Sequence, residues 1–309
     1  MTSSVETSVR PAYRPYRARV VGVERLGPSF RRVHFHGDGF EDFGTAGLDQ
    51  RVKLLLPTPE APGTGIADEP HDGLWYARWR AMPTAERPIL RTYTVRRIRE
   101  GVLTIDFVVH HDAGPAGAWA EAADLGDEIV IVGPDELSSD SRSGIDWHPR
   151  GARTVLLAGD ETAAPAICSI LESLHGTDVA ATAFIEVPHA ADAQHVELAP
   201  RSTLTWLARD EAEHGETLID AVRVWCAASR HHLDSVAAAE RQELADIDVD
   251  RELLWDAPTG GVGDFYAWMA GESSVVKTLR RLLVQDHGVD RSRVAFMGYW
   301  RAGQSERTE

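Results

Sequence analysis

The sequence predicts a chain of two parts: an antiparallel, six-stranded β-barrel of the Greek-key type, followed by an α/β domain with a mostly parallel sheet. Short runs rich in β-branched and aromatic residues, separated by turn signals, fill the first part and are typical of a small barrel. After residue 150 apolar strands alternate with amphipathic helices, which indicates a parallel sheet. The predicted barrel strands are Ala18–Glu24, Phe30–His36, Arg51–Leu56, Tyr93–Ile98, Val102–His110 and Glu128–Val132.

Composition along the chain sets the expected boundaries. A polar segment that contains Ser138-Ser139-Asp140-Ser141 lies between the strand-rich and the helix-rich parts and is the best linker candidate. Prolines and glycines mark residues 57–73 as a loop. We therefore expect a flexible N-terminus at 1–16, a barrel domain at 17–137, a linker at 138–151 and an α/β domain at 152–309.

Charge and cysteine content restrict the partners. The formal net charge is −16, and an acidic surface repels both nucleic acid and anionic membranes, so neither is expected as a partner. The only cysteines, Cys168 and Cys226, form no metal-type or redox pair, which favours a reducing cytoplasm. No stretch resembles a signal peptide or reaches the roughly 20 apolar residues of a membrane span. The sequence predicts a cytoplasmic, globular protein without membrane insertion.

The α/β part contains two strand-to-helix turns. The strand Thr154–Ala158 leads through Gly159-Asp160-Glu161-Thr162 into a helix, and Phe265–Met269 leads through Ala270-Gly271-Glu272-Ser273-Ser274 into another. Ligands of parallel sheets bind beyond the carboxyl ends of the strands, beside helix N-termini, so both turns lie where a dinucleotide is expected. Neither carries the full glycine-rich fingerprint, and a tight turn with a capping Asp or Ser explains each equally well.

One barrel strand combines a cation, an aromatic ring and hydroxyl groups. Alternate residues of a strand face opposite sides, so Arg91 and Tyr93 share one face and Thr92 and Thr94 share the other. At the end of a sheet these groups suit a flavin: the guanidinium would hold a pyrophosphate, the phenol would lie against the isoalloxazine, and a threonine would bond near N5. The alternative is an ordinary exposed strand with scattered arginines.

A second small-residue turn follows the strand that ends at Val109, His110 and His111. Gly114-Pro115-Ala116-Gly117-Ala118-Trp119 opens a short helix whose bare N–H groups suit a phosphate, and the two histidines would contact the nucleotide half of a flavin. This additional phosphate site favours FAD over FMN. The alternatives are that the histidines are solvated or packed and that Trp119 belongs to the core.

These motifs together resemble the siderophore-interacting protein family of the ferredoxin reductase-like flavoproteins. The resemblance runs from about Arg17 to Gly303, through the motifs already described and the closing Gly298-Tyr299-Trp300-Arg301. It implies a flavin-binding barrel, a nicotinamide-binding α/β domain and the reduction of ferric siderophores. The residues at 91–94 and 114–118 resemble the family's flavin contacts, those at 160–162 and 271–272 its nicotinamide side, and Trp300 and Arg301 residues that close over the flavin or substrate.

The predicted cofactor-binding residues are Arg91, Thr92, Tyr93, Thr94, Val109, His110, His111, Gly114, Pro115, Ala116, Gly117, Ala118, Trp119, Asp160, Glu161, Thr162, Gly271, Glu272 and Trp300. The cofactors are FAD and, as electron donor, NADH or NADPH. Arg209 and Arg230 are candidates for a 2'-phosphate contact, among several arginines that qualify. No general acid, base or nucleophile is expected, because a flavin accepts a hydride and passes electrons on singly.

A ferric siderophore is often anionic, so a local basic site is expected. Lys53, Arg96, Lys277 and Arg301 lie in or beside the motifs and are the predicted substrate-binding residues, with a solvated helix face as the alternative for Lys277. No metal site of the protein itself is expected. His34 and His36 share a strand face without a third ligand, which favours an edge strand.

One segment departs from the family pattern. Residues 223–263 form a longer connection than usual, with an alanine-rich helix expected at about Leu233 to Ala245. Three functions stay open: a ferric-siderophore reductase, a flavoprotein that passes electrons between a nicotinamide and a small redox protein such as a ferredoxin, and a ferric-siderophore binding protein without turnover.

Overall fold

The computed structural model describes residues 10–44, 46–61, 65–68, 70–109, 114–238, 242, 244, 247, 252, 254–258 and 263–304. The chain divides into two compact units. The first consists of Met1–Val23, Val33–Ile105 and Ala122–Ile145, and the second of Glu24–Arg32, Asp106–Glu121 and Asp146–Glu309. None of the helices in the described ranges is long and apolar enough to cross a membrane.

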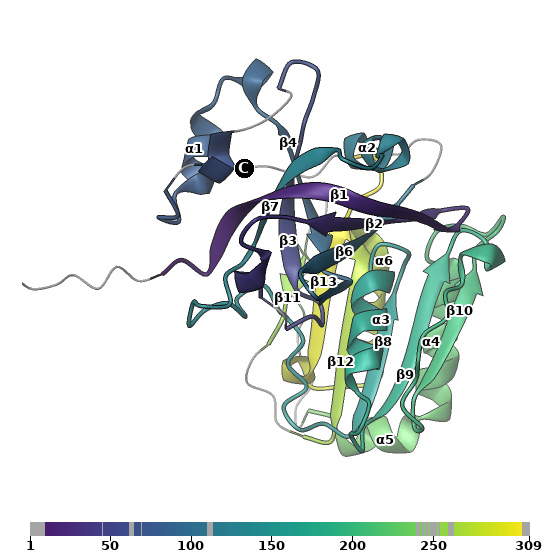
Figure 1. Ribbon diagram of the computed structural model, residues 1–309. Helices are drawn as coiled ribbons and strands as arrows, with labels where there is room; N and C mark the ends of the chain where they lie inside the picture. Colours follow the sequence, from purple (N-terminus) through teal and green to yellow (C-terminus); the bar gives the residue numbers. More distant parts are fainter. Residues whose placement is uncertain are drawn as a thin grey trace, which may run out of the picture. The chain divides into compact units, whose positions relative to one another are not determined.

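The first sheet has seven strands in the order β4-β3-β7-β1-β2-β6-β5 (Figure 1). Its pairs β1/β7, β3/β4, β3/β7 and β5/β6 are antiparallel, which confirms the predicted barrel class. The strands are β1 (Tyr13–Gly27), β2 (Phe30–His36), β3 (Arg51–Leu56), β4 (Ile89–Thr94), β5 (Arg97–Arg99), β6 (Val102–Val108) and β7 (Glu128–Pro134).

The strand expected at Tyr93–Ile98 is in fact two strands, so the predicted count of six was wrong. Between β4 and β5 the Val95 N–H donates to Gln50 O (2.9 Å), beside β3, and the Arg96 N–H donates to Thr104 O (3.0 Å), in β6. Since β4 and β5 are the two edges of the sheet, only two residues join its edges. The sheet curves back on itself at this point.

Three short helical turns and two helices accompany this sheet: η1 (Phe40–Asp42), η2 (Gly65–Asp68), α1 (Trp75–Ala81), η3 (Thr84–Glu86) and α2 (Pro115–Ala122). In its described residues the predicted loop at 57–73 contains one 3-10 turn, and α1 follows it. Trp79 of α1 packs on Leu55, Leu90 and Val130 of the sheet, and its indole N–H donates to Pro88 O (3.0 Å).

The second sheet is built around five parallel strands in the order β10-β9-β8-β12-β13, and β11 lies antiparallel beside β13. This confirms the mostly parallel sheet. The strands are β8 (Thr154–Gly159), β9 (Ala180–Val187), β10 (Thr203–Ala208), β11 (Trp255–Asp256), β12 (Phe265–Glu272) and β13 (Val294–Trp300). The helices are α3 (Ala164–Ser173), α4 (Glu216–Ala228), α5 (Arg230–Ser235), α6 (Ser273–Arg281) and the turns η4 (Ala190–Asp192), η5 (Leu282–Asp286) and η6 (Arg291–Arg293).

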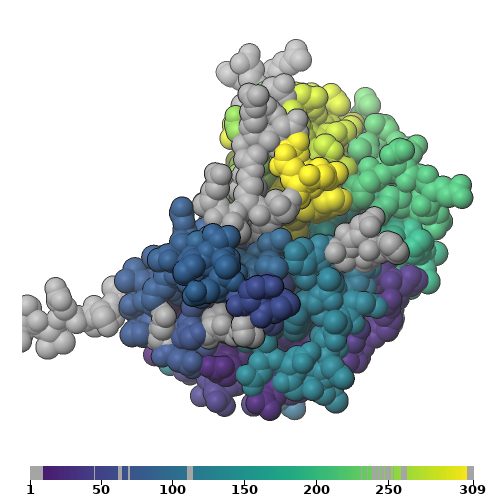
Figure 2. All heavy atoms as spheres, turned by 90° about the horizontal axis from the view of Figure 1, so that it is seen from above, coloured from purple at the N-terminus to yellow at the C-terminus, as the bar shows by residue number. Residues whose placement is uncertain are grey.

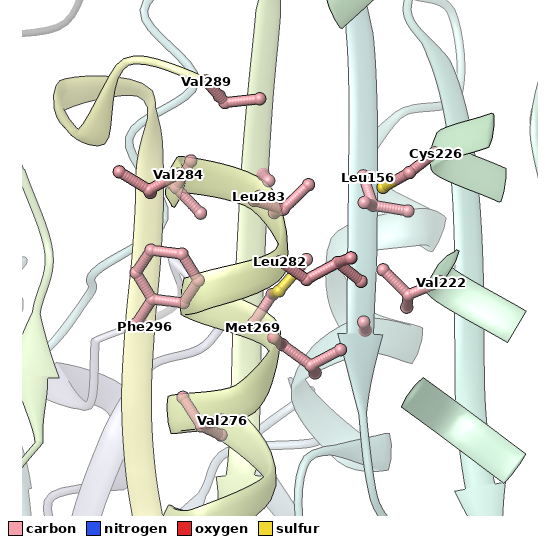
Figure 3. Close-up of a cluster of buried hydrophobic side chains, with 14 of the residues drawn as sticks. Leu156, Val222, Cys226, Met269, Val276, Leu282, Leu283, Val284, Val289 and Phe296 are labelled. Carbon is pink, nitrogen blue, oxygen red and sulfur yellow. The ribbon is translucent and has the colours of Figure 1, made fainter. Parts of the chain in front are cut away.

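Apolar residues from α4 and α6 pack on one face of this sheet (Figure 3). Val222 and Val276 come from the helices, and Leu156, Met269 and Phe296 come from the central strands. Each is at most 1% exposed, so each contributes about 1.5 to 3 kcal/mol through its burial. This packing fixes the helix N-termini at the carboxyl ends of the strands.

The long connection after residue 222 differs from its prediction. Its first residues belong to α4, which continues to Ala228. The prediction of a helix from about Leu233 to Ala245 was wrong in the part that the structure describes. The helix α5 ends at Ser235, and Ala237 pairs with Val289 in an antiparallel bridge. That pairing removes Ala237 from the helical hydrogen-bond pattern.

Candidate functional site

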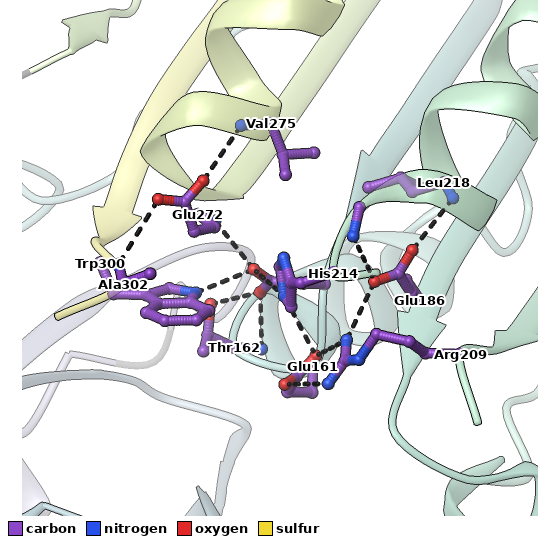
Figure 4. A network of polar contacts seen from close by, with 12 residues as sticks. Glu161, Thr162, Glu186, Arg209, His214, Leu218, Glu272, Val275, Trp300 and Ala302 are labelled. Carbon is purple, nitrogen blue, oxygen red and sulfur yellow. Dashed lines mark hydrogen bonds and ion pairs between the residues drawn. The ribbon is translucent and has the colours of Figure 1, made fainter. Parts of the chain in front are cut away.

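A network of charged side chains lies at the carboxyl ends of the parallel strands (Figure 4). Three carboxylates, Asp160, Glu186 and Glu272, each accept hydrogen bonds from backbone N–H groups at the start of a helical segment. The first turns of α3, α4 and α6 leave such N–H groups without a partner in their own helix. The chain's own acids therefore occupy positions that an anionic ligand would otherwise use.

Asp160 is the centre of the network. Its Oδ1 accepts from the N–H (2.9 Å) and the hydroxyl (2.6 Å) of Thr162, and its Oδ2 accepts from the Glu272 N–H (2.8 Å) and the Trp300 indole (2.8 Å). Burial and the neighbouring Glu161 raise the pKa of Asp160 above its ordinary value. The carboxylate thus ties the start of α3 to the ends of β12 and β13.

Glu161 and Glu186 hold Arg209 between them. The guanidinium donates from Nη2 to Glu161 Oε1 (3.0 Å) and from Nη1 to Glu161 Oε2 (3.2 Å) and Glu186 Oε1 (2.9 Å). Arg209 directly follows β10, whereas its partners lie after β8 and near the end of β9. Charge-assisted, forked bonds of this kind fix both the position and the orientation of the guanidinium.

Glu186 also anchors the start of α4. It accepts from the Gly215 N–H (2.7 Å), the Thr217 hydroxyl (2.7 Å) and the Leu218 N–H (3.1 Å). Burial opposes its ionisation, but these donors and Arg209 outweigh burial and hold the pKa of Glu186 below its ordinary value. Glu186 is therefore a buried, fully engaged carboxylate.

His214 lies against Trp300, with ring centroids 5.2 Å apart and planes at 85°. Its Nε2 is 3.6 Å from Asp160 Oδ2 and 3.9 Å from Glu161 Oε2, and one ligating atom from each of these three residues lies within 4.8 Å of the others. Both Asp160 oxygens already accept two hydrogen bonds, and both Glu161 oxygens face Arg209. This donor set favours an ion-pair network over a metal centre.

Gly271 allows this network to close. Its φ is +146°, and a β-carbon there would lie 2.6 Å from Asp160 Oδ2. The neighbouring Glu272 caps α6 by accepting from the N–H groups of Ser274 (2.7 Å) and Val275 (3.1 Å). Only glycine leaves room for the Asp160 carboxylate at this position.

We expect Gly271→Ala to lower the free energy of unfolding by about 1 to 3 kcal/mol, because the new methyl group displaces Asp160 from its donors. Urea denaturation measures the change. Gly65→Ala is the matched control, since no atom lies within 4 Å of a β-carbon at that position. Equal stability of the two variants would contradict the close approach.

The predicted flavin residues of β4 differ in burial. Thr94 is buried, whereas Arg91, Thr92 and Tyr93 are partly exposed. Arg91 Nη1 donates to Leu90 O (2.7 Å), and Thr92 accepts from Lys53 of the opposite strand. The partly exposed cation, phenol and hydroxyl are groups of the kinds that a flavin requires.

The predicted phosphate turn begins α2. Among the described residues, no atom lies within 4 Å of a β-carbon built on Gly114. The Val109 N–H is already used by Ser29 O (2.8 Å), and the Trp119 ring packs on Phe107 with centroids 5.7 Å apart. His110 and His111 lie outside the described residues.

The four predicted substrate cations have different surroundings. Lys53 donates to Thr92, and Arg96 is buried where β4 passes into β5. Lys277 donates to Ile247 O (2.6 Å), while Arg301 is partly exposed. The last described residues, 302–304, are exposed, and the atoms coloured yellow in Figure 2, which end with these residues, lie at the surface. Of the four, Lys53 and Lys277 thus have their ammonium groups engaged within the protein.

His34 Nδ1 lies 3.0 Å from Thr104 Oγ1, consistent with an ordinary hydrogen bond between neighbouring strands. This contact explains the side chain without a metal, but the predicted edge strand was wrong, because β2 lies between β1 and β6 in the sheet.

The prediction of site residues missed Glu186 and His214, and left Arg209 as one arginine among many. A signal for Glu186 was present, because an acidic residue near the end of the apolar strand Ala180–Val187 needs a buried partner. The structure does bring Asp160, Thr162, Glu272 and Trp300 together, as their shared hydrogen bonds show.

Comparison with known proteins agrees with this architecture. Residues 19–137 match the model of the siderophore-interacting FAD-binding domain, and residues 152–303 match that of siderophore-interacting proteins. The ferric vibriobactin reductase ViuB of Vibrio cholerae is 28% identical over 71% of this chain and 67% of its own length. The NADPH-dependent ferric-chelate reductase of Escherichia coli is 26% identical over 92% of this chain and 91% of its own. The crystal structure of a siderophore utilization protein from T. fusca superposes with a TM-score of 0.68, at 30% identity and 96% coverage of both chains. The chain belongs to the siderophore-interacting protein family.

Proposed function

We propose that this protein is an FAD-dependent reductase that converts the Fe(III) of a ferric siderophore to Fe(II) and so releases the iron. The match of residues 19–137 to a siderophore-interacting FAD-binding domain, ahead of a parallel α/β sheet, carries the proposal. The names of the Vibrio and Escherichia relatives, both ferric reductases, support it. Siderophores hold Fe(III) with hard oxygen ligands that bind Fe(II) more weakly, so reduction releases the metal.

Residues of the chain have distinct roles in this proposal. Arg91 would neutralise a flavin phosphate, Tyr93 would lie against the isoalloxazine, and Thr94 would bond to the ring. The main chain at Gly114–Ala118 would contribute N–H groups to the second phosphate. When bound, FAD accepts two electrons as a hydride and passes them on singly. We place the FAD-binding domain at 17–137 and the nicotinamide-binding domain at 152–309.

The electron donor in this proposal is NADH or NADPH, bound at the carboxyl edge of the parallel sheet, where Asp160, Glu161, Thr162, Gly271, Glu272 and Trp300 lie. A small redox protein such as a ferredoxin is the alternative donor. Either donor is available in the cytoplasm, where we place the protein. The arrangement requires no side chain to act as acid or base.

The experiment that tests the function starts from the purified protein and its bound flavin. The flavin is released, identified and removed, and iron release is followed with an Fe(II) chelator for the loaded and the flavin-free protein. We expect FAD, and Fe(II) formation that needs both FAD and a donor. Formation of Fe(II) at the same rate without flavin would contradict the proposal, and reduction only on addition of a ferredoxin would identify the alternative donor.

A further inference from the structure

We infer that this chain uses NADH in preference to NADPH, and that Glu161, Glu186 and the acidic loop after β10 determine the choice. The inference rests on the proposed function, because it concerns the donor of the same reductase. The inferred donor, NADH, differs from the NADPH that appears in the name of the Escherichia coli relative.

The two donors differ only by the 2'-phosphate of NADPH. In doubly wound α/β sheets an acidic residue suits the free ribose hydroxyls of NADH, whereas NADPH requires an arginine for its extra phosphate. Arg209 directly follows β10, at the carboxyl edge of the sheet where such ligands bind. It is therefore the described arginine whose position best suits a 2'-phosphate.

Arg209, however, is already committed. Three hydrogen bonds of 2.9 to 3.2 Å join it to Glu161 and Glu186, and the side chains of the three residues are 15%, 7% and 0% exposed. Both N–H groups of Nη1 and one of the two on Nη2 are used in these bonds, so a phosphate that binds the Nη pair would have to displace two buried carboxylates. Breaking a buried ion pair leaves uncompensated charge in the interior, which is strongly unfavourable.

The loop that carries Arg209 adds repulsion. Asp210, Glu211 and Glu213 follow it and are exposed, and Glu216 lies exposed in the first turn of α4. A phosphate bound at Arg209 would add its charge to a segment that already carries these exposed acids within seven residues. Like charges a few ångströms apart repel even in water.

The N–H groups at the neighbouring helix starts offer little compensation. Those of Thr162, Gly215, Leu218, Ser274 and Val275 already donate to Asp160, Glu186 and Glu272. NADH and NADPH share the pyrophosphate, so only the additional phosphate must be placed. These five N–H groups are engaged with the chain's own carboxylates.

A matched pair of ligands without nicotinamide tests the inference by binding alone. ADP-ribose and 2'-phospho-ADP-ribose are titrated into the FAD-loaded protein by calorimetry at low ionic strength, where surface charges are least screened. We expect the phosphorylated ligand to bind at least about tenfold more weakly, a difference of about 1.4 kcal/mol. Equal or tighter binding of the phosphorylated ligand overturns the inference, as does failure of both ligands to bind.

Failure of the inference can be separated from failure of the reductase. Protein whose flavin is reduced photochemically needs no nicotinamide, and its ability to reduce ferric siderophore is measured in parallel. If neither ADP-ribose nor 2'-phospho-ADP-ribose binds while the photoreduced protein forms Fe(II), the inference is overturned and the proposed reductase function stands. If the photoreduced protein forms no Fe(II), the proposed function fails whichever nucleotide binds.

Two variants test which acidic residues weaken the binding of 2'-phospho-ADP-ribose relative to ADP-ribose. In Glu161→Gln one acid no longer holds Arg209, and we expect the ratio of the two dissociation constants to fall by about three- to tenfold. Because that variant removes a buried charge, a second one changes only exposed residues: Asp210→Asn, Glu211→Gln and Glu213→Gln combined, with the same expected direction. Glu197→Gln, at an exposed position on another loop, is the control. An unchanged ratio in the triple variant contradicts the role of the loop.

Discussion

Replacing Glu186 by alanine is expected to lower the free energy of unfolding by about 3 to 5 kcal/mol, the largest loss among the substitutions considered, because it removes one partner of a buried ion pair. The carboxylate is 0% exposed and accepts from Arg209, Gly215, Thr217 and Leu218. Its removal leaves the donors at the start of α4, and one of the three hydrogen bonds of Arg209, without an acceptor. Urea denaturation followed by far-ultraviolet circular dichroism measures the change.

Glu216→Ala is the matched control, since Glu216 lies exposed in the first turn of the same helix. Surface substitutions of this kind change stability by at most about 0.5 kcal/mol. If the two variants lost equal stability, Glu186 would not be the anchor that its contacts indicate.

The same carboxylate predicts a pH dependence. The pKa of Glu186 in the folded protein is below its ordinary value, so its contribution to stability is fully present above the unfolded value of about 4.3. The contribution is lost as the pH falls through the lower, folded-state pKa. We expect the difference in unfolding free energy between the wild type and Glu186→Gln to shrink between pH 7 and about pH 3. A constant difference over this range would show that the pKa of Glu186 is the same in the folded and the unfolded protein, which would contradict the prediction.

Replacing Arg91 by alanine is expected to raise the dissociation constant for FAD by about 10- to 100-fold, because a charge-assisted contact to phosphate is worth about 1.5 to 3 kcal/mol. Arg91 is partly exposed on β4, opposite Leu54 of β3, and its truncation leaves the buried residues Leu90 and Thr94 in place. Fluorescence titration of flavin-free protein with FAD measures the affinity.

Arg97→Ala serves as the control for Arg91→Ala, since Arg97 is an exposed arginine on β5, the next strand along the chain. Unchanged thermal unfolding of both flavin-free variants establishes that the fold is intact. Equal affinity of the Arg91 and Arg97 variants for FAD would remove Arg91 from the flavin site.

The fold was largely predictable because its signals are local. Alternating apolar residues mark strands such as Phe30–His36, and helical spacing marks the buried face of α3. The break at Val95 and Arg96 was not predictable, since the residues on both sides continue a strand-like pattern. What divides β4 from β5 is a change of hydrogen-bond partner, from Gln50 to Thr104, and such pairing depends on residues far along the chain.

In the candidate site, too, local features were predictable and contacts between distant residues were not. Asp160, Glu161 and Glu272 were predicted because each follows or ends a strand at a turn, and the structure places Asp160 within hydrogen-bond distance of the Glu272 N–H. The clamp around Arg209 joins residues that are 23 and 48 positions apart in the sequence. Only the parallel arrangement of β8, β9 and β10 brings these residues to one edge.

The central claim, that this chain reduces ferric siderophore through its flavin, is tested most directly by a single-turnover titration. The FAD-loaded protein is reduced photochemically without oxygen, titrated with a ferric siderophore in the presence of an Fe(II) chelator, and followed by its visible spectrum. We expect the absorbance of oxidised flavin to return as about two Fe(II) form per flavin, since reduced FAD carries two electrons and Fe(III) accepts one. A flavin that stays reduced while the ferric siderophore binds would contradict the account and identify a binding protein instead.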